Sequence, residues 1–168
     1  MKSTGGIPAR PTTYKGVRMR SRLEAGFAMW LDQQRWTWAY EPECFANEHG
    51  QWLPDFRLDI PCVTHTDDGV RWGFPTYVEV KPVSFGLGLE RNAGRKVEAD
   101  ELATRMSTTF ATHPDAGLVL AQEGTNPIAI SPSGEQAPVD WTWTGLWPID
   151  ARRVGGPWQR EWWKDVAA

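Results

Sequence analysis

Hydrophobic positions in the first part of the chain change from a helical period to a strand period, and this change predicts the first elements. From Ser21 to about Gln34 the apolar residues recur at helical spacing, Ser21 can act as the N-cap, and Glu24 follows three residues later as in a capping box. Beyond this helix, apolar and polar residues alternate in segments that mostly end at prolines, which is typical of strands. The predicted strands are residues 36–41, 52–60 and 76–81.

The second part of the chain predicts one more helix and one more strand. Apolar residues at helical spacing indicate a helix from Lys96 to about His113, and the short apolar run 118–120 indicates a buried strand. The other segments are interpreted as a turn region at 43–51, a polar connection at 62–75 and a loop at 86–94. The order helix, three strands, helix, strand predicts an α/β fold with a mixed central sheet flanked by helices.

Composition divides the chain into three expected parts. Residues 1–13 are rich in Gly, Pro, Ser and Thr, which predicts a flexible N-terminal arm. Residues 14–121 carry the periodic segments and form the expected core. Residues 122–168 show little periodicity and are dense in tryptophan, so we expect a C-terminal extension that packs on the core.

Several classes of protein are disfavoured by the composition. No apolar run approaches the roughly 20 residues that span a bilayer, and the first residues lack the apolar stretch of a secretory signal. We therefore expect an intracellular, cytoplasmic protein without a membrane partner. Cys44 and Cys62 make no disulfide framework and lack zinc-site spacing, and the three histidines lie far apart in the sequence.

Basic residues are concentrated in two segments although the net charge is −3. One segment precedes and begins the first predicted helix, and the other lies at the start of the second, where the helix dipole also favours phosphate. Beside an acidic cluster, such groups are candidates for contacts with nucleic-acid phosphates. These candidates are Arg18, Arg20, Arg22, Arg95 and Lys96.

Two predicted strands bring together residues suited to phosphodiester hydrolysis. Glu79 and Lys81 point the same way because side chains alternate along a strand. If the strand of Asp55 is a neighbour, its carboxylate converges with Glu79 at one edge of the sheet. Converging carboxylates need a compensating cation, and hard oxygen ligands suit Mg²⁺ or Mn²⁺. A lysine beside them can orient a water or stabilise developing negative charge.

Each of these residues also has a purely structural interpretation. Glu24 can be only the glutamate of the capping box, and Asp55 after a proline can be a turn acid. Glu79 and Lys81 can be an ordinary salt-bridge pair. Glu41 and Asp59 also lie on predicted strands, where we interpret them as surface acids.

Two motifs resemble the signature of the PD-(D/E)XK nuclease superfamily, which has the restriction-endonuclease-like fold. Leu-Pro-Asp-Phe at 53–56 is followed by Glu-Val-Lys at 79–81. Residues 20–24, Arg-Ser-Arg-Leu-Glu, are similar to the first-helix motif of small phage and transposon-type members. The αβββαβ core of this family has the element order predicted here, and the resemblance covers about residues 14–121.

The resemblance implies a role for each motif residue. It assigns Asp55, Glu79 and the backbone carbonyl of Val80 to metal binding, Lys81 to catalysis, and Glu24 to an accessory role, direct or through water. The activity it implies is hydrolysis of DNA phosphodiester bonds with Mg²⁺ or Mn²⁺, and RNA stays open as a substrate. It also leaves open a phage-encoded protein inside a bacterial host.

Two alternatives to a lone nuclease remain. One is a catalytically inactive nucleic-acid or protein-binding module of the same fold. The other is a nuclease subunit of a larger transposase-like or phage assembly, for which the tryptophan-rich extension is the relevant feature. A homodimer is a further arrangement that the sequence leaves open.

Overall fold

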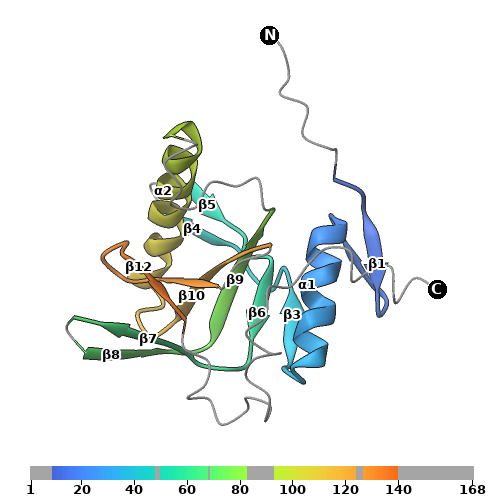
Figure 1. Ribbon diagram of the computed structural model, residues 1–168, viewed down its shortest axis with the longest axis horizontal. Helices are drawn as coiled ribbons and strands as arrows, with labels where there is room; N and C mark the ends of the chain where they lie inside the picture. Colours follow the sequence, from blue (N-terminus) through green and yellow to red (C-terminus); the bar gives the residue numbers. More distant parts are fainter. Residues whose placement is uncertain (1–8, 48–49, 68, 83–92, 124–126, 140–168) are drawn as a thin grey trace.

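A six-stranded mixed sheet lies between two helices in the computed structural model, which describes residues 9–47, 50–67, 69–82, 93–123 and 127–139 (Figure 1). The strand order is β12-β11-β10-β9-β6-β3. These strands are β3 Trp38–Tyr40, β6 Phe56–Leu58, β9 Thr76–Lys81, β10 Gly117–Gln122, β11 Ile128–Ile130 and β12 Gln136–Pro138. The helices are α1 Arg22–Gln33 and α2 Ala93–Ser107, and a short 3-10 helix, η2 Thr108–Ala111, follows α2.

The sheet changes from antiparallel to parallel pairing at its centre. Strands β3, β6 and β9 form an antiparallel meander, with Phe56 paired to both Tyr40 and Val78. Strand β10 then runs parallel to β9, with Leu120 beside Glu79, and α2 makes the crossover that a parallel pair requires. The predicted α/β class with a mixed sheet and flanking helices is therefore confirmed.

Helix α1 begins where the sequence predicts. The Ser21 hydroxyl accepts a hydrogen bond from the backbone N–H of Glu24 at 3.2 Å and so caps the first turn. Leu23, Phe27 and Leu31 are buried along one stripe of the helix. The helix ends at Gln33, and Arg35 soon after it adopts a left-handed conformation with φ of 61°.

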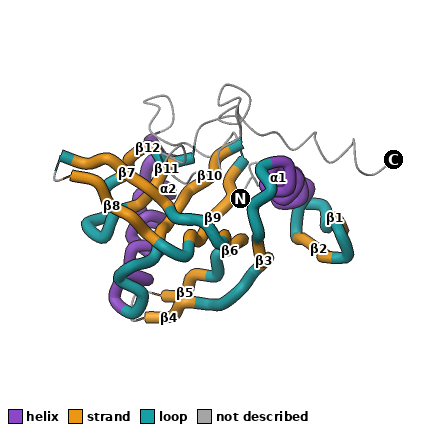
Figure 2. The backbone as a smooth tube through the Cα atoms, turned by 90° about the horizontal axis from the view of Figure 1, so that it is seen from below, coloured by secondary structure: helices purple, strands orange, loops and turns teal. Residues whose placement is uncertain are grey.

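The two helices cover opposite faces of the sheet, and alternating side chains supply two apolar clusters (Figure 2). Phe56, Leu58 and Val78 pack with α1. Tyr77 and Leu118, whose side chains lie on the other face, pack with residues of α2. Of the predicted strand 52–60, only Phe56–Leu58 forms a strand, β6, and Phe56, Leu58 and the following Ile60 are buried as the alternation predicts. Trp52 belongs instead to a separate strand, β5 Gly50–Trp52, so the predicted bounds were wrong.

Two segments that were interpreted as turn and connection form hairpins instead. Residues 43–51 contribute to the hairpin β4 Phe45–Asn47 with β5 Gly50–Trp52, and residues 62–75 contribute to β7 Cys62–Thr66 with β8 Gly69–Gly73. The interpretation of these segments was wrong because short hairpins carry few apolar residues, so their pairing leaves a weak period-2 signal.

The ends of the predicted core also differ from the described sheet. Strand β1 Thr12–Tyr14 pairs with β2 Val17–Met19 in a hairpin beside α1, so the last residues of the predicted arm are a strand. Strands β11 and β12 extend the main sheet past residue 121. The tryptophans of the predicted extension, residues 141–163, lie outside the described residues. Among the described residues, no helix has the length and apolarity to cross a membrane.

Candidate active site

The carboxylate of Asp55 lies between the ends of β6 and β9. Asp55 precedes β6, whose first residue pairs with Val78, so Asp55 lies across from Glu79. Its Oδ2 accepts a hydrogen bond from the backbone N–H of Val80 at 2.7 Å, and its side chain is almost fully buried. The side chain of Asp55 thus continues the β6–β9 ladder beyond the last backbone pair.

Glu79 is held by two donors from different elements. The indole N–H of Trp52 donates to Oε2 at 2.8 Å, and Lys81 Nζ lies 2.8 Å from Oε1. The Lys81 contact confirms that the two residues point the same way from β9. Trp52 comes from the β4–β5 hairpin and is buried, so this hairpin fixes the orientation of the Glu79 carboxylate.

Glu24 faces the same site from the first turn of α1. Its Oε2 accepts hydrogen bonds from the Tyr40 hydroxyl at 2.6 Å and from the backbone N–H of Arg20 at 3.0 Å. The Ser21 half of the predicted capping box is present, but the Glu24 carboxylate accepts from the Arg20 N–H and the Tyr40 hydroxyl. Burial and the hydrogen bond to Glu24 raise the pKa of Tyr40, so its hydroxyl stays a donor.

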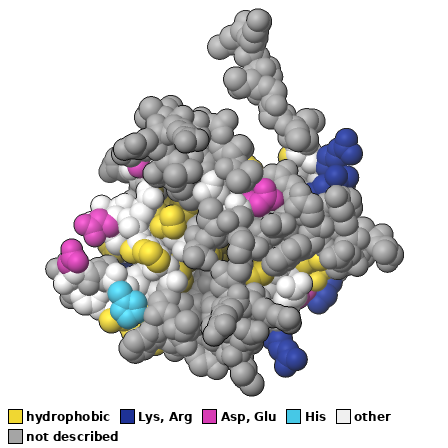
Figure 3. Space-filling view, viewed as in Figure 1, with side chains coloured by type: hydrophobic (Ala, Val, Ile, Leu, Met, Phe, Trp, Pro, Cys, Tyr) yellow, Lys and Arg dark blue, Asp and Glu magenta, His cyan; other side chains and the backbone are white. Residues whose placement is uncertain are grey.

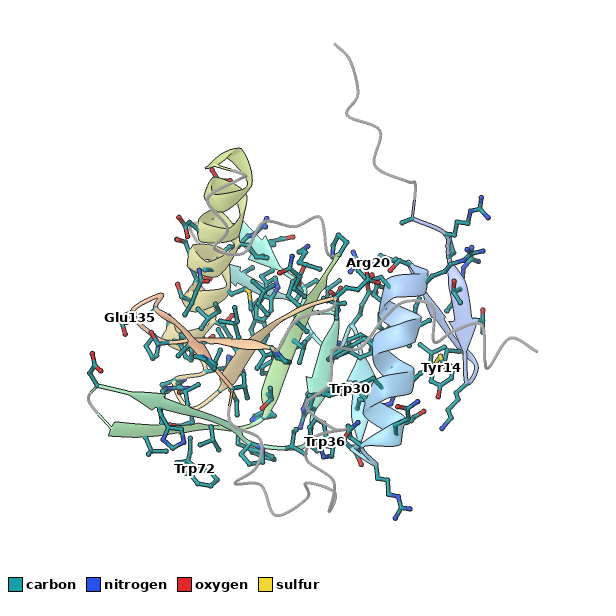
Figure 4. The ribbon with its side chains drawn as sticks, viewed as in Figure 1. Tyr14, Arg20, Trp30, Trp36, Trp72 and Glu135 are labelled. Atoms are coloured by element: carbon teal, nitrogen blue, oxygen red, sulfur yellow. The ribbon has the colours of Figure 1, made fainter. Side chains whose placement is uncertain are left out.

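Arg20 connects the acids of the site. Its Nη2 lies 2.7 Å from Asp55 Oδ1, and its Nε lies 2.8 Å from Glu41 Oε1 and 4.0 Å from Glu24 Oε1. Figure 4 shows Arg20 between the first turn of α1 and the ends of the central strands. Burial alone would lower the pKa of Arg20, but Tyr40, Asp55 and Glu24 raise it, so the guanidinium stays charged.

The crowding of acids shifts the ionisation of Asp55. Burial, the charge of Glu79 and the charge of Glu24 together raise the pKa of Asp55 to about 8, although the Val80 N–H and Arg20 act in the opposite direction. Four carboxylates meet two cations here, since Glu41 and Lys81 complete the set. With all four carboxyl groups ionised, the cluster has an excess of negative charge, which either the proton on Asp55 or a further cation compensates.

The donor set fits a hard divalent cation in its chemistry. Asp55 and Glu79 offer carboxylate oxygens, the type of ligand that Mg²⁺ and Mn²⁺ prefer. The carbonyl of Val80 points to the same side of β9 as its N–H, which faces Asp55. Within the described residues, no three His, Cys, Asp or Glu side chains are grouped closely enough to hold a metal as they stand.

The predicted phosphate contacts are placed unequally. Arg18 is exposed on β2, Arg22 is half-buried at the start of α1, and Arg20 is in the acid cluster. Arg95 and Lys96 belong to α2, but their side chains lie outside the described residues. On the face drawn in Figure 3, the described basic side chains lie in separate spots along the right side of the molecule, which is the side of α1 and the β1–β2 hairpin.

Sequence reasoning missed three residues of the site, namely Tyr40, Glu41 and Trp52. Glu41 was interpreted as a surface acid, yet it is half-buried and paired with Arg20. Its backbone has a φ of 44°, and a left-handed conformation at a non-glycine residue is a feature of constrained positions. The only sequence signal for it was its place as the last residue of a predicted strand, directly before Pro42.

Comparison of the chain with protein-family models, with curated proteins and with solved structures gives no match. The geometry of the site therefore carries the functional argument.

Proposed function

We propose that this protein is a divalent-metal-dependent nuclease that hydrolyses DNA phosphodiester bonds, on a core of the restriction-endonuclease-like type. One observation carries the proposal. Glu24 on α1, Asp55 directly before β6 and Glu79 on β9 lie near one another at one end of the sheet, with Lys81 on Glu79. The residues of the motifs that resemble nuclease motifs are thus close together in the fold.

The proposed cation is Mg²⁺ or Mn²⁺, held by Asp55, Glu79 and the carbonyl of Val80. When bound, such an ion supplies charge neutralisation at the phosphate and makes a water a better nucleophile. The raised pKa of Asp55 supports this assignment, because it reflects buried acids that the nearby basic groups do not fully neutralise.

Lys81 is the proposed catalytic lysine. Its ammonium is held on Glu79 at 2.8 Å, and about a quarter of its side chain is exposed, so it is accessible to a substrate. A positive charge fixed at this place stabilises negative charge that develops on the phosphate oxygens. Glu24 is proposed to orient groups in the site through the hydroxyl of Tyr40, to which it is bonded.

The exposed basic side chain that precedes the site in the chain supports a polyanionic substrate. Arg18 is exposed on β2, which precedes Arg20 and α1 in the chain. Positive side chains at this position attract a phosphate backbone without reading its sequence. We propose that the DNA backbone approaches along this side of the molecule.

The decisive experiment is a cleavage assay with linear, nicked, flapped and four-way DNA in Mg²⁺ or Mn²⁺. Asp55→Asn and Lys81→Gln should each lower the cleavage rate by about a thousandfold or more, because each removes a group that acts at the reacting phosphate. Asp59→Asn is the matched control, since Asp59 is an exposed acid of the neighbouring chain segment. Undiminished cleavage by Asp55→Asn would contradict the proposal.

A further inference from the structure

The Arg20 side chain bridges two acids that have different places in the proposed site. Its Nη2 is 2.7 Å from Oδ1 of Asp55, a proposed metal ligand, and its Nε is 2.8 Å from Oε1 of Glu41, which is not one. More than half of the Arg20 side chain is exposed, so its guanidinium can move without crossing the core (Figure 4). The residue is thus anchored to the site at two points.

Asp55 has donors on both of its oxygens. The backbone N–H of Val80 binds Oδ2 at 2.7 Å, and this donor is part of strand β9 and cannot leave without disturbing the sheet. The other donor, the Arg20 guanidinium on Oδ1, belongs to a long side chain. A cation that binds Asp55 therefore competes with Arg20 rather than with Val80.

Glu41 is fixed next to Arg20 by its backbone. Its φ of 44° lies in the left-handed region, and its N–H donates to the Asp55 carbonyl at 2.9 Å. Backbone strain of this kind persists only where the surrounding structure holds it in place. The Glu41 backbone is consequently fixed beside the site, so its carboxylate is within reach of the guanidinium whether or not Arg20 stays on Asp55.

We propose that Arg20 and the divalent cation are alternative counter-ions of Asp55, and that Glu41 retains the guanidinium when the metal displaces it. This inference rests on the proposed function. Arg20 is then a positioning residue that keeps the acids together before the metal binds, and it sets the affinity of the site for the metal. Glu41 acts on the metal through Arg20 and not as a ligand.

Calorimetric titration of the full chain with Mn²⁺, without DNA, tests whether Arg20 and the cation compete for Asp55. Arg20→Gln should bind Mn²⁺ about tenfold more tightly. The guanidinium and the metal ion repel each other when they lie a few ångström apart, and even in water this repulsion corresponds to about a factor of ten in affinity. Arg105→Gln makes the same charge change on the exposed side of α2 and should leave the affinity unchanged. Equal or weaker binding by Arg20→Gln would overturn the inference.

The double variant tests the role of Glu41. Glu41→Gln alone should weaken Mn²⁺ binding severalfold, since the guanidinium then has Asp55 as its main partner. In the Arg20→Gln background, Glu41→Gln should change the affinity little, because the two effects are coupled. If Glu41→Gln weakens binding equally in both backgrounds, Glu41 acts as a ligand or a distant charge, and its proposed role is wrong.

Thermal unfolding with and without Mn²⁺ tests the same proposal even if Arg20→Gln is too unstable for calorimetry. Arg20→Gln should lose stability without metal and regain it with Mn²⁺, since the metal replaces the missing counter-ion. Arg20→Met, which keeps the aliphatic part of the side chain, should behave in the same way. If neither Arg20→Gln nor Arg20→Met folds at saturating Mn²⁺, the proposal is contradicted. Wild-type protein that neither binds Mn²⁺ nor cleaves DNA would overturn both the inference and the proposed function. Cleavage by wild type without tighter binding by Arg20→Gln would overturn the inference alone.

Discussion

At its first residues strand β9 is packed against neighbouring backbone, whereas at its last residues it carries charged groups. Beside Thr76, a Cβ atom added to Gly73 would lie 2.5 Å from the Cα of Gly117, and one added to Gly117 would lie 2.4 Å from the Cβ of Cys62. The Thr76 hydroxyl donates to the Ile60 carbonyl at 2.7 Å. At this end the Thr76 hydroxyl has a hydrogen-bond partner, and the backbone at Gly73 and Gly117 is packed too closely to admit a side chain.

The other end of β9 gathers like charges in a buried place. Asp55 and Glu79 are both buried and face each other, and their repulsion contributes to the raised pKa of Asp55. Such an arrangement lowers the stability of the protein without a compensating cation, which is the cation that the proposed function supplies. One end of β9 is thus closely packed, whereas the other keeps like charges in a buried place, and the proposed function assigns catalysis to that second end.

The largest effect of a single substitution on stability is expected at the packed end. Gly73→Ala should lower the free energy of unfolding by about 3 kcal/mol, because the neighbouring atoms belong to backbone that cannot move aside. Urea unfolding measures the change. Gly134→Ala, at a position with a φ of 83° and no atom within 4 Å, should lose only about 1 kcal/mol from backbone strain. Equal losses in the two variants would contradict the close approach.

The next effect concerns the orientation of Glu79. Trp52→Phe removes the indole donor on Oε2 and should lower Mn²⁺ affinity or cleavage by about 10- to 100-fold, as is usual for groups that orient metal ligands. Trp72→Phe is the matched control, because Trp72 is half-exposed on β8. A loss of stability without any change in metal affinity would show that Trp52 only packs.

Asp55 should give the metal-free protein a distinctive pH dependence. Its pKa rises from 3.8 to about 8 on folding, so between these values the folded state holds one proton more than the unfolded state. The stability that Asp55 contributes is therefore complete below pH 4 and is lost as the pH rises through about 8, by up to roughly 1.4 kcal/mol per pH unit. Urea unfolding from pH 5 to 8 in EDTA should show this slope, and Asp55→Asn should flatten it. Identical slopes in the two proteins would mean that Asp55 ionises normally.

The smallest effect separates capping from chemistry at the start of α1. Ser21→Ala should lower the free energy of unfolding by about 1 kcal/mol and leave cleavage unchanged per folded molecule, because the hydroxyl only caps the Glu24 N–H. Glu24→Gln keeps the cap and should instead lower cleavage, since it alters the carboxylate bonded to Tyr40. If Glu24→Gln affects stability alone, the structural interpretation of Glu24 is correct.

The strongest sequence patterns predicted the elements that position the site. The cap at Ser21 and the helical stripe of α1 are local features, and the third predicted strand, residues 76–81, is the β9 of the structure. The strand period also placed Glu79 and Lys81 on one side, which their 2.8 Å contact confirms. These features depend on residues close in sequence, so one sequence suffices to find them.

The partners of the site residues are different, because they come from distant parts of the chain. Arg20 was predicted as a phosphate contact, yet it lies on Asp55, which is far along the sequence. Trp52 belongs to a hairpin that the pattern did not indicate, and Glu41 was taken for a surface acid. Their roles depend on the register of β3, β6 and β9.

The sequence by itself determined the acids, the lysine and the order of α1, β3, β6, β9, α2 and β10, but not the hairpins between them. Only the tertiary structure decided that the Asp55 side chain accepts from the Val80 N–H and that Trp52 orients Glu79. It also decided that the guanidinium of Arg20 contacts Asp55. The physical reason is that periodicity specifies which way a side chain points from its own element. The groups that it meets there are set by the pairing of strands and by burial, which no local pattern contains.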